Sequence, residues 1–187
     1  MQPAELLRIL AVAEKLKCTT RHCITTSGRQ ESVAEHSWRI ALMALLLEQE
    51  YPQADMNRVI RMCLIHDLGE AFTGDIPVFE KDAGEEQYED QVFDRWVATL
   101  PKPVRGEFTS LLLEMRALKT LEAKIYKALD KMEAVIQHNE SDIASWLPLE
   151  YDLQLRYGGE NVKFSPWFQN LKAEIDDWTR RKIAENK

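Results

Sequence analysis

The sequence predicts an all-α protein, an irregular bundle of helices. Its 187 residues are close to the length of one ordinary domain. It contains only seven glycines and seven prolines, where average usage would give about 22 of the two together, so residues that interrupt helices are scarce. Apolar residues recur at helical spacing, and no alternating strand pattern extends beyond a few residues. We therefore expect a single domain over residues 1–187, without a solenoid-like repeat.

The first predicted helix covers residues 6–16, where apolar residues recur every three or four positions. It follows Pro3, which an opening helical turn tolerates because the missing N–H would have no partner there. The periodicity then disappears over residues 18–30, among Thr, Ser and Gly. We expect this segment to be a surface loop.

The next two predicted helices begin at recognisable caps. Ser32 and Glu35 have the spacing of a capping box, in which each side chain bonds the backbone N–H of the other residue, and this predicts a helix over residues 33–50. Asp55 can cap a third helix. That helix leads into residues 69–77, where two glycines and a proline interrupt regular structure.

The second half of the chain contains four more segments with helical spacing of apolar residues. They cover residues 88–100, 104–118, 121–136 and 166–178. The third of them has a long apolar stripe, and Thr120 is its expected cap. Ser165 and Pro166 open the last one. The stretch before them, residues 137–164, is less regular.

Charge and hydropathy exclude several classes of function. The formal net charge of −7 opposes attraction to nucleic acid or to an anionic membrane. The longest unbroken apolar run, residues 41–47, is far shorter than the ~20 residues of a spanning helix. The N-terminus has no basic head before an apolar stretch, and the three cysteines form no Cys-x-x-Cys pair. We expect a cytoplasmic protein with reduced thiols that binds neither nucleic acid polymers nor membranes.

Four residues on three predicted helices are candidate metal ligands. His36 lies on the apolar face of its helix, and the adjacent pair His66 and Asp67 faces inward near the end of the next. Asp130 lies at the margin of the long apolar stripe. A buried carboxylate needs a charged partner or a metal. If the four residues converge, two imidazoles and two carboxylates without a thiolate suit Mn, Co, Fe, Mg or Zn, with water completing the coordination.

Each of these residues also has an ordinary structural explanation. His36 can be a core histidine with one satisfied ring N–H, and Asp67 can be solvated. Asp130 can be solvated or can pair with Lys127 or Lys131. The order His, His-Asp, Asp across three helices is what favours a metal site.

The sequence resembles the HD-domain metal-dependent phosphohydrolases, which are named for an adjacent His-Asp pair. Within that superfamily it is most similar to the small 5'-deoxynucleotidases, which release phosphate from deoxynucleoside 5'-monophosphates. The resemblance implies an HD-domain helical bundle over about residues 6–140, with a helical extension over residues 141–187. The segments that match the family are, in order, ESVAEH at 31–36, HDLGE at 66–70, TGDIP at 73–77 and EAKIYKALD at 122–130.

The resemblance also implies a metal site and a mechanism. By similarity, His36, His66, Asp67 and Asp130 hold one divalent metal ion, and a metal-bound water attacks phosphorus to release inorganic phosphate. Glu70 corresponds to a family glutamate that assists proton transfer to or from water or the leaving oxygen.

Three further residues are implied at the substrate. Arg21 stands where the family places an arginine that clamps phosphate. Asp75 follows Thr-Gly as in the family and is expected to help with the leaving group or the sugar. His22 is a departure, because related bacterial nucleotidases carry a tryptophan there that crowds the ribose 2' position. Selectivity between deoxyribose and ribose therefore stays open, and His22 can instead contact phosphate.

A nucleoside 5'-monophosphate phosphohydrolase is the leading hypothesis, and two alternatives remain. The same metal site can act on another phosphate ester, such as a cyclic nucleotide, a nucleoside triphosphate or an alarmone. A non-catalytic helical binding protein with a vacant metal site is the alternative from a different class, against which the intact ligand positions, Glu70 and Arg21 argue. Members of the resembling family often form dimers, which suggests a homodimer. The native metal and the preferred base stay open.

Overall fold

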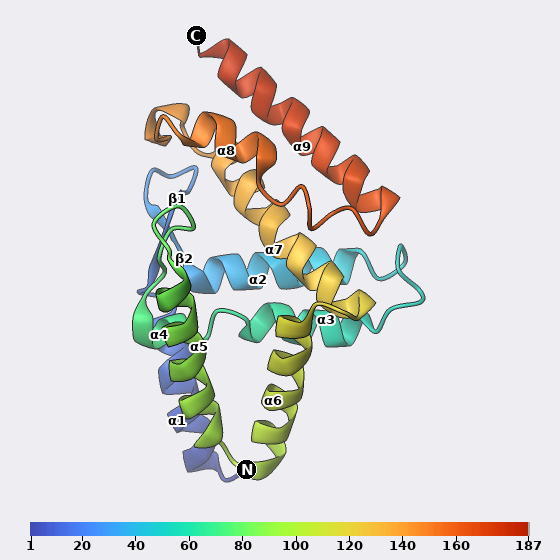
Figure 1. Ribbon diagram of the computed structural model, residues 1–187. Coiled ribbons are helices and arrows are strands. Elements are labelled where there is room, and N and C mark those ends of the chain that lie inside the picture. Colours follow the sequence, from blue (N-terminus) through green and yellow to red (C-terminus); the bar gives the residue numbers. More distant parts are fainter. Residues whose placement is uncertain (187) are drawn as a thin grey trace.

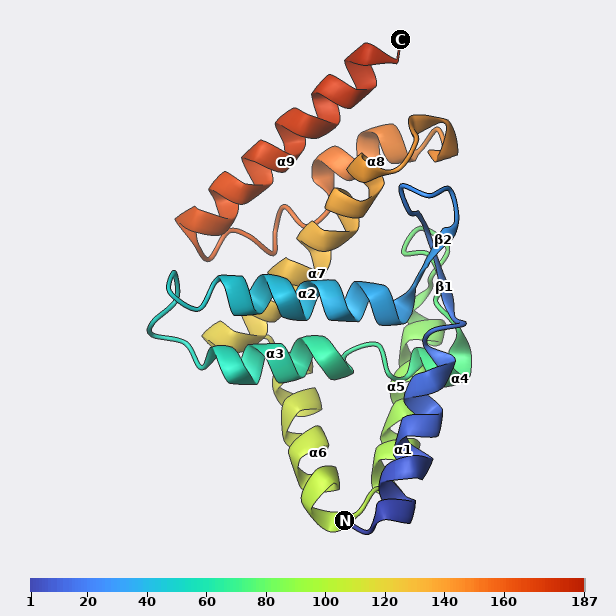
Figure 2. The ribbon, with the colours of Figure 1, turned by 180° about the vertical axis from the view of Figure 1, so that it is seen from behind.

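Helix α7 (Leu121–Glu140) is the centre of the fold in the computed structural model, which describes residues 1–186. Its long apolar stripe is buried, as predicted. Figures 1 and 2 show α2 and α3 lying side by side across α7, while α6 and α9 pack on it from opposite ends. These four partners are α2 (Val33–Leu46), α3 (Met56–Ile65), α6 (Lys102–Ala117) and α9 (Pro166–Glu185). The expected helical fold class is confirmed.

The predicted helix starts are present as hydrogen-bonded caps. The Ser32 side chain accepts a bond from the backbone N–H of Glu35, whose carboxylate accepts one from the backbone N–H of Ser32. The side chains of Asp55, Thr120 and Ser165 accept bonds in the same way at the starts of α3, α7 and α9. The local sequence therefore determines where these helices begin.

The expected surface loop over residues 18–30 is wrong in part, because the chain forms a β-hairpin there. Strand β1 (Thr20–Ile24) pairs antiparallel with β2 (Gln30–Ser32), with an irregularity in register. Gly28 has a φ of 84° in the connecting turn, a conformation that glycine adopts without strain. The side chain of Gln137 on α7 donates a hydrogen bond to the backbone of β1. Short polar strands held by distant partners leave no periodic signal in the sequence.

Other boundaries differ by a few residues, and three short helices were not predicted. Helix α2 ends at Leu46 rather than at residue 50, because the chain turns before Tyr51. The unpredicted helices are each seven residues or fewer, too short to show an apolar period. They are α4 (Glu70–Thr73), the 3-10 helix η1 (Ile143–Ser145) and α8 (Glu150–Arg156).

The remaining helices, α1 (Pro3–Lys15) and α5 (Ala83–Ala98), extend with α6 toward one end of the molecule, and α9 lies at the other end (Figure 1). Helix α1 contacts α4, which in turn contacts α5. Among residues 1–186, no helix combines the length and apolarity needed to cross a bilayer. The start of α2, the end of α3 and the middle of α7 meet between these two ends, and this junction holds the candidate site.

Candidate metal centre and substrate cavity

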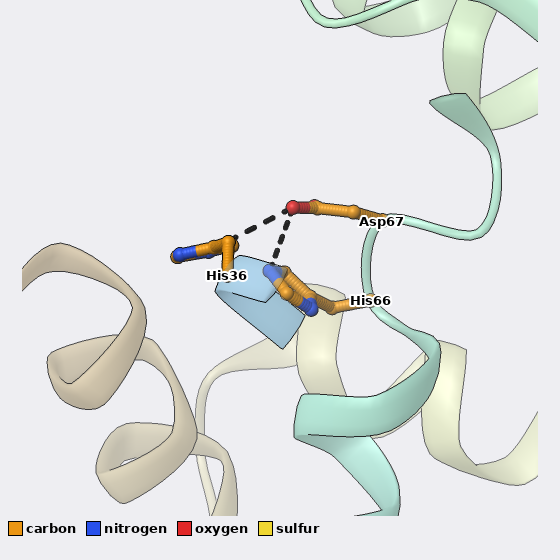
Figure 3. Close-up of side chains that lie close together, drawn as sticks. All are labelled: His36, His66 and Asp67. Carbon is orange, nitrogen blue, oxygen red and sulfur yellow. Dashed lines mark ion pairs between the residues drawn. The ribbon is translucent and has the colours of Figure 1, made fainter. Parts of the chain in front are cut away.

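The structure brings the four predicted metal ligands together. His36 lies in the first turn of α2 and is wholly buried, His66 caps the C-terminus of α3, and Asp67 follows it. Asp130 comes from the middle of α7. The Oδ2 atom of Asp67 lies 3.8 Å from His36 Nε2 and 2.9 Å from His66 Nε2 (Figure 3). The Oδ1 atom of Asp130 lies 3.4 Å and 3.9 Å from the same two nitrogens.

The free nitrogen atoms of the two imidazoles face this centre. His36 Nδ1 bonds Glu133 Oε2 at 2.5 Å, and His66 Nδ1 donates to the backbone oxygen of Cys63 at 2.9 Å. These bonds fix the rings, because a proton on Nδ1 leaves a lone pair on Nε2. Both Nε2 atoms are buried and make no hydrogen bond to any residue within 1–186. Since buried polar atoms without partners are costly, this donor set fits a divalent cation.

Both carboxylates are held in the charged form that a cation requires. Burial alone would raise the pKa of Asp130, but Lys127 and Lys131 hold it well below the usual range. Their Nζ atoms lie 2.9 Å and 3.4 Å from Asp130 Oδ2. Burial likewise opposes ionisation of Asp67, but the neighbouring His66 and His36 lower the pKa of that carboxyl. Asp130 therefore pairs with both lysines through Oδ2, as the structural alternative expected. Its other oxygen, Oδ1, faces the two histidines.

Sequence reasoning missed Glu133, which orients His36. Glu133 is wholly buried on α7, and besides His36 it faces two cations, with Arg21 Nη1 at 3.8 Å and Arg39 Nη1 at 3.7 Å. A carboxylate that accepts the second ring N–H of a ligating histidine fixes its tautomer and raises its basicity. The available signal was its position one turn after Asp130 on the same helix.

We expect Glu133→Gln to weaken metal binding by about 10- to 100-fold, because the amide keeps the shape of the side chain but removes the charge that supports His36. Titration of the metal against a competing chelating dye measures this affinity. Glu174→Gln, on the exposed surface of α9, is the matched control and should leave it unchanged. An unaltered affinity in the Glu133 variant would show that this contact does not support a metal ligand.

The predicted catalytic carboxyl groups, Glu70 and Asp75, lie in the same cavity as Asp67 and Asp130 of the candidate metal centre. Glu70 is the first residue of α4, and its buried Oε2 atom makes no hydrogen bond to the described part of the chain. Burial, reinforced by Asp67 and Asp75, raises the pKa of Glu70 to about 11. Burial also raises the pKa of Asp75. The Glu70 carboxyl is therefore protonated at neutral pH.

Strand β1 supplies the two basic residues predicted at the substrate. The Arg21 side chain is largely buried between Glu31 and Glu133, and its Nη1 atom makes no hydrogen bond within residues 1–186. His22 points elsewhere, with Nε2 3.3 Å from Glu150 Oε1 on α8. Arg21 thus lies beside Glu133, the partner of His36, whereas His22 contacts Glu150 on α8.

One cavity connects these groups. Six of the eight predicted site residues line it, namely Arg21, His22, Asp67, Glu70, Asp75 and Asp130. The other two are not in the lining, but His36 contacts Asp130 and His66 contacts Asp67. The lining also includes residues that sequence reasoning did not single out. Most of them come from the loop after α4 and from α8 or its end, and His138 comes from α7. Among them are Phe79, Lys81, His138, Glu150, Gln154 and Tyr157.

The chain is similar to known proteins over nearly its whole length. The human 5'-deoxynucleotidase HDDC2 is 32% identical over 184 residues, covering 96% of this chain and 88% of the human protein. The Dictyostelium discoideum 5'-deoxynucleotidase HDDC2 is 30% identical over 182 residues, covering 91% and 96%.

Solved structures show the same fold. A predicted metal-dependent phosphohydrolase from Magnetospirillum magnetotacticum superposes with a TM-score of 0.79 at 30% identity, covering 96% of this chain and 93% of that one. The cyanophage S-2L HD phosphohydrolase DatZ, bound to dA and one catalytic Zn²⁺, superposes with a TM-score of 0.58 at 19% identity, covering 99% and 98%. The family model for the HD domain matches residues 13–181. The chain therefore belongs to the HD-domain family, as its motifs indicated.

Proposed function

We propose that this protein is a metal-dependent phosphohydrolase that releases inorganic phosphate from deoxynucleoside 5'-monophosphates. One observation carries the proposal. Two buried imidazole nitrogens, which have no hydrogen-bond partner in the described part of the chain, and two ionised carboxylates meet beside a cavity that Arg21 and Glu70 also line. The 5'-deoxynucleotidases that resemble this chain over nearly its whole length support the same substrate class.

The ligand set assigned to the metal is His36, His66, Asp67 and Asp130. Its nitrogen and oxygen donors suit Mn, Co, Fe, Mg or Zn, so the identity of the ion depends on availability as well as on the site. A divalent cation held there supplies positive charge to the phosphoryl oxygens and acidifies a water molecule at neutral pH.

The protein side chains account for the other parts of the reaction. Arg21 binds the phosphate, because its guanidinium group has unused donors at the cavity and its fork matches phosphate oxygens. Glu70 donates a proton to the leaving 5'-oxygen, because its raised pKa keeps the carboxyl protonated at neutral pH. The proton of the attacking water passes to solvent, and Glu70 regains a proton from solvent after the products leave. Asp75 also lines the cavity, and we assign it to the leaving group or the sugar.

A phosphate-release screen tests the proposal. We expect the purified protein, supplied with Mn, Co or Mg, to release phosphate from deoxynucleoside 5'-monophosphates and to lose this activity in excess chelator. Nucleoside triphosphates, cyclic nucleotides and alarmones belong in the same screen, because pyrophosphate, triphosphate or ring-opened products identify the alternative esters. Absence of phosphate release from every deoxynucleoside monophosphate with all three metals would overturn the proposal.

A further inference from the structure

One face of α8 forms the side of the cavity that the proposed reaction does not use. Glu150, Leu153, Gln154 and Tyr157 all line the cavity. Leu153, Gln154 and Tyr157 follow Glu150 by three, four and seven residues. This spacing places the four side chains on one face of α8, with Tyr157 directly after the end of the helix. This α8 wall lines the same cavity as Asp67 and Asp130 of the candidate metal centre.

The polar group at one end of the α8 wall is already committed to protein contacts. Glu150 is 1% exposed, and its Oε2 atom accepts a bond from the backbone N–H of Leu147 at 2.7 Å. Its Oε1 atom lies 3.3 Å from His22 Nε2 and 3.5 Å from His138 Nε2. The His22 ring also packs edge-on against Phe79, with centroids 5.4 Å apart. Glu150 therefore anchors His22 and has little capacity left for a ligand.

Gln154, one turn further along, differs from Glu150. The residue is only 3% exposed, and its amide makes no hydrogen bond with any residue the structure describes, but its nitrogen and oxygen are not fully enclosed and open onto the cavity. Gln137 on α7 is similarly buried, but its amide accepts a bond from Arg39 and donates one to Ile24. An amide that faces a cavity without a protein partner can bond water in the free protein and is available to a ligand that offers a matching donor and acceptor.

The position of the phosphate determines which part of a nucleotide reaches Gln154. Arg21 and His22 are consecutive residues of β1, and the first lies beside the metal centre while the second contacts α8. With the phosphate at Arg21, the sugar passes His22 and the base reaches the α8 wall. Apolar side chains of Phe79 and Leu153 line the cavity there and offer surfaces for the faces of a planar base.

We propose that Gln154 is a specificity-determining residue that hydrogen-bonds to the polar edge of the nucleotide base. The inference rests on the proposed function, since it takes the substrate to be a nucleoside monophosphate. A primary amide presents a donor and an acceptor side by side, and such a pair distinguishes bases by the order of their own donors and acceptors. The enzyme consequently discriminates among bases, and Gln154 is the source of the discrimination.

The test compares wild type with Gln154→Leu and Gln154→Glu. Two quantities are measured for each metal-loaded protein: kcat/KM for phosphate release from the four deoxynucleoside 5'-monophosphates, and calorimetric dissociation constants of the four corresponding deoxynucleosides. We expect the wild type to prefer one base over the least favoured by about tenfold, the value of one hydrogen bond of ordinary net strength. Gln154→Leu should reduce this range to about twofold, mainly through KM.

The second variant and the control keep the test decisive. Gln154→Glu preserves the shape of the side chain but only accepts hydrogen bonds, so it should change the order of preference rather than remove it. Gln53→Leu, at an exposed position, should leave the order unchanged.

The wild type and the variants separate the two proposals. Equal treatment of the four bases by the wild type, or unchanged base preference in both Gln154 variants, would overturn the role of Gln154. Lack of phosphate release by the wild type would overturn the proposed function, and the deoxynucleoside affinities would still test Gln154.

Discussion

Asp67→Ala is expected to abolish metal binding and turnover together. The Asp67 carboxylate lies within 3.8 Å of the unbonded nitrogens of both histidines, so it connects the two imidazoles around the proposed ion. Its removal deletes a ligand and one of the negative charges that offset the cation. The loss of affinity should exceed the about 10- to 100-fold cost of changes outside the ligand set. Metal content after desalting and phosphate release measure the two effects.

The control for this variant is Asp152→Ala, on the outer surface of α8, where the side chain is 77% exposed. It should keep both metal and activity. If Asp67→Ala retained one equivalent of metal, the ion would have to lie elsewhere. A second group of potential ligands, Glu31, His36 and Glu133, is close enough together to be considered in that event.

Glu70→Gln is expected to keep the metal and lose turnover by about 10²- to 10⁴-fold, the usual contribution of a positioned acid or base. Glu70 is not among the four ligands, and glutamine preserves its size in the buried site. The amide cannot donate the proton that the raised pKa of the carboxyl keeps on Glu70 at neutral pH. Single-turnover phosphate release and metal content measure the two properties separately.

The control for Glu70→Gln is Glu86→Gln, at an exposed position of α5, which should retain full activity. Activity close to wild type in the Glu70 variant would assign proton transfer to another group. Asp75, which lines the same cavity and whose pKa is also raised by burial, would then be the next residue to replace.

The parts of the fold that could be predicted are those with local physical causes. The caps at Ser32, Asp55, Thr120 and Ser165 depend on residues within one helical turn, and the sequence shows them directly. The β1–β2 hairpin depends on pairing between separate segments and on a hydrogen bond from Gln137, more than a hundred residues away. Such distant contacts leave no periodic pattern.

The same distinction between local and distant causes applies to the residues of the site. His36, His66, Asp67 and Asp130 could be proposed because they sit in ordered motifs on inward faces of predicted helices. Residues whose role depends on tertiary contacts could not be proposed from the sequence. Whether an acidic side chain faces His36 or solvent is decided by packing, as for Glu133. The short helix α8 showed no apolar period, so its cavity-lining residues, Glu150 and Gln154, were not recognised.

The most direct test of the central claim is a crystal structure of the protein grown with Mn²⁺, with anomalous diffraction used to locate the ion. We expect a single strong peak bonded to His36 Nε2, His66 Nε2 and oxygens of Asp67 and Asp130. A well-ordered site in which the peak is absent, or in which the ion is bonded to fewer than three of these four residues, would contradict the account.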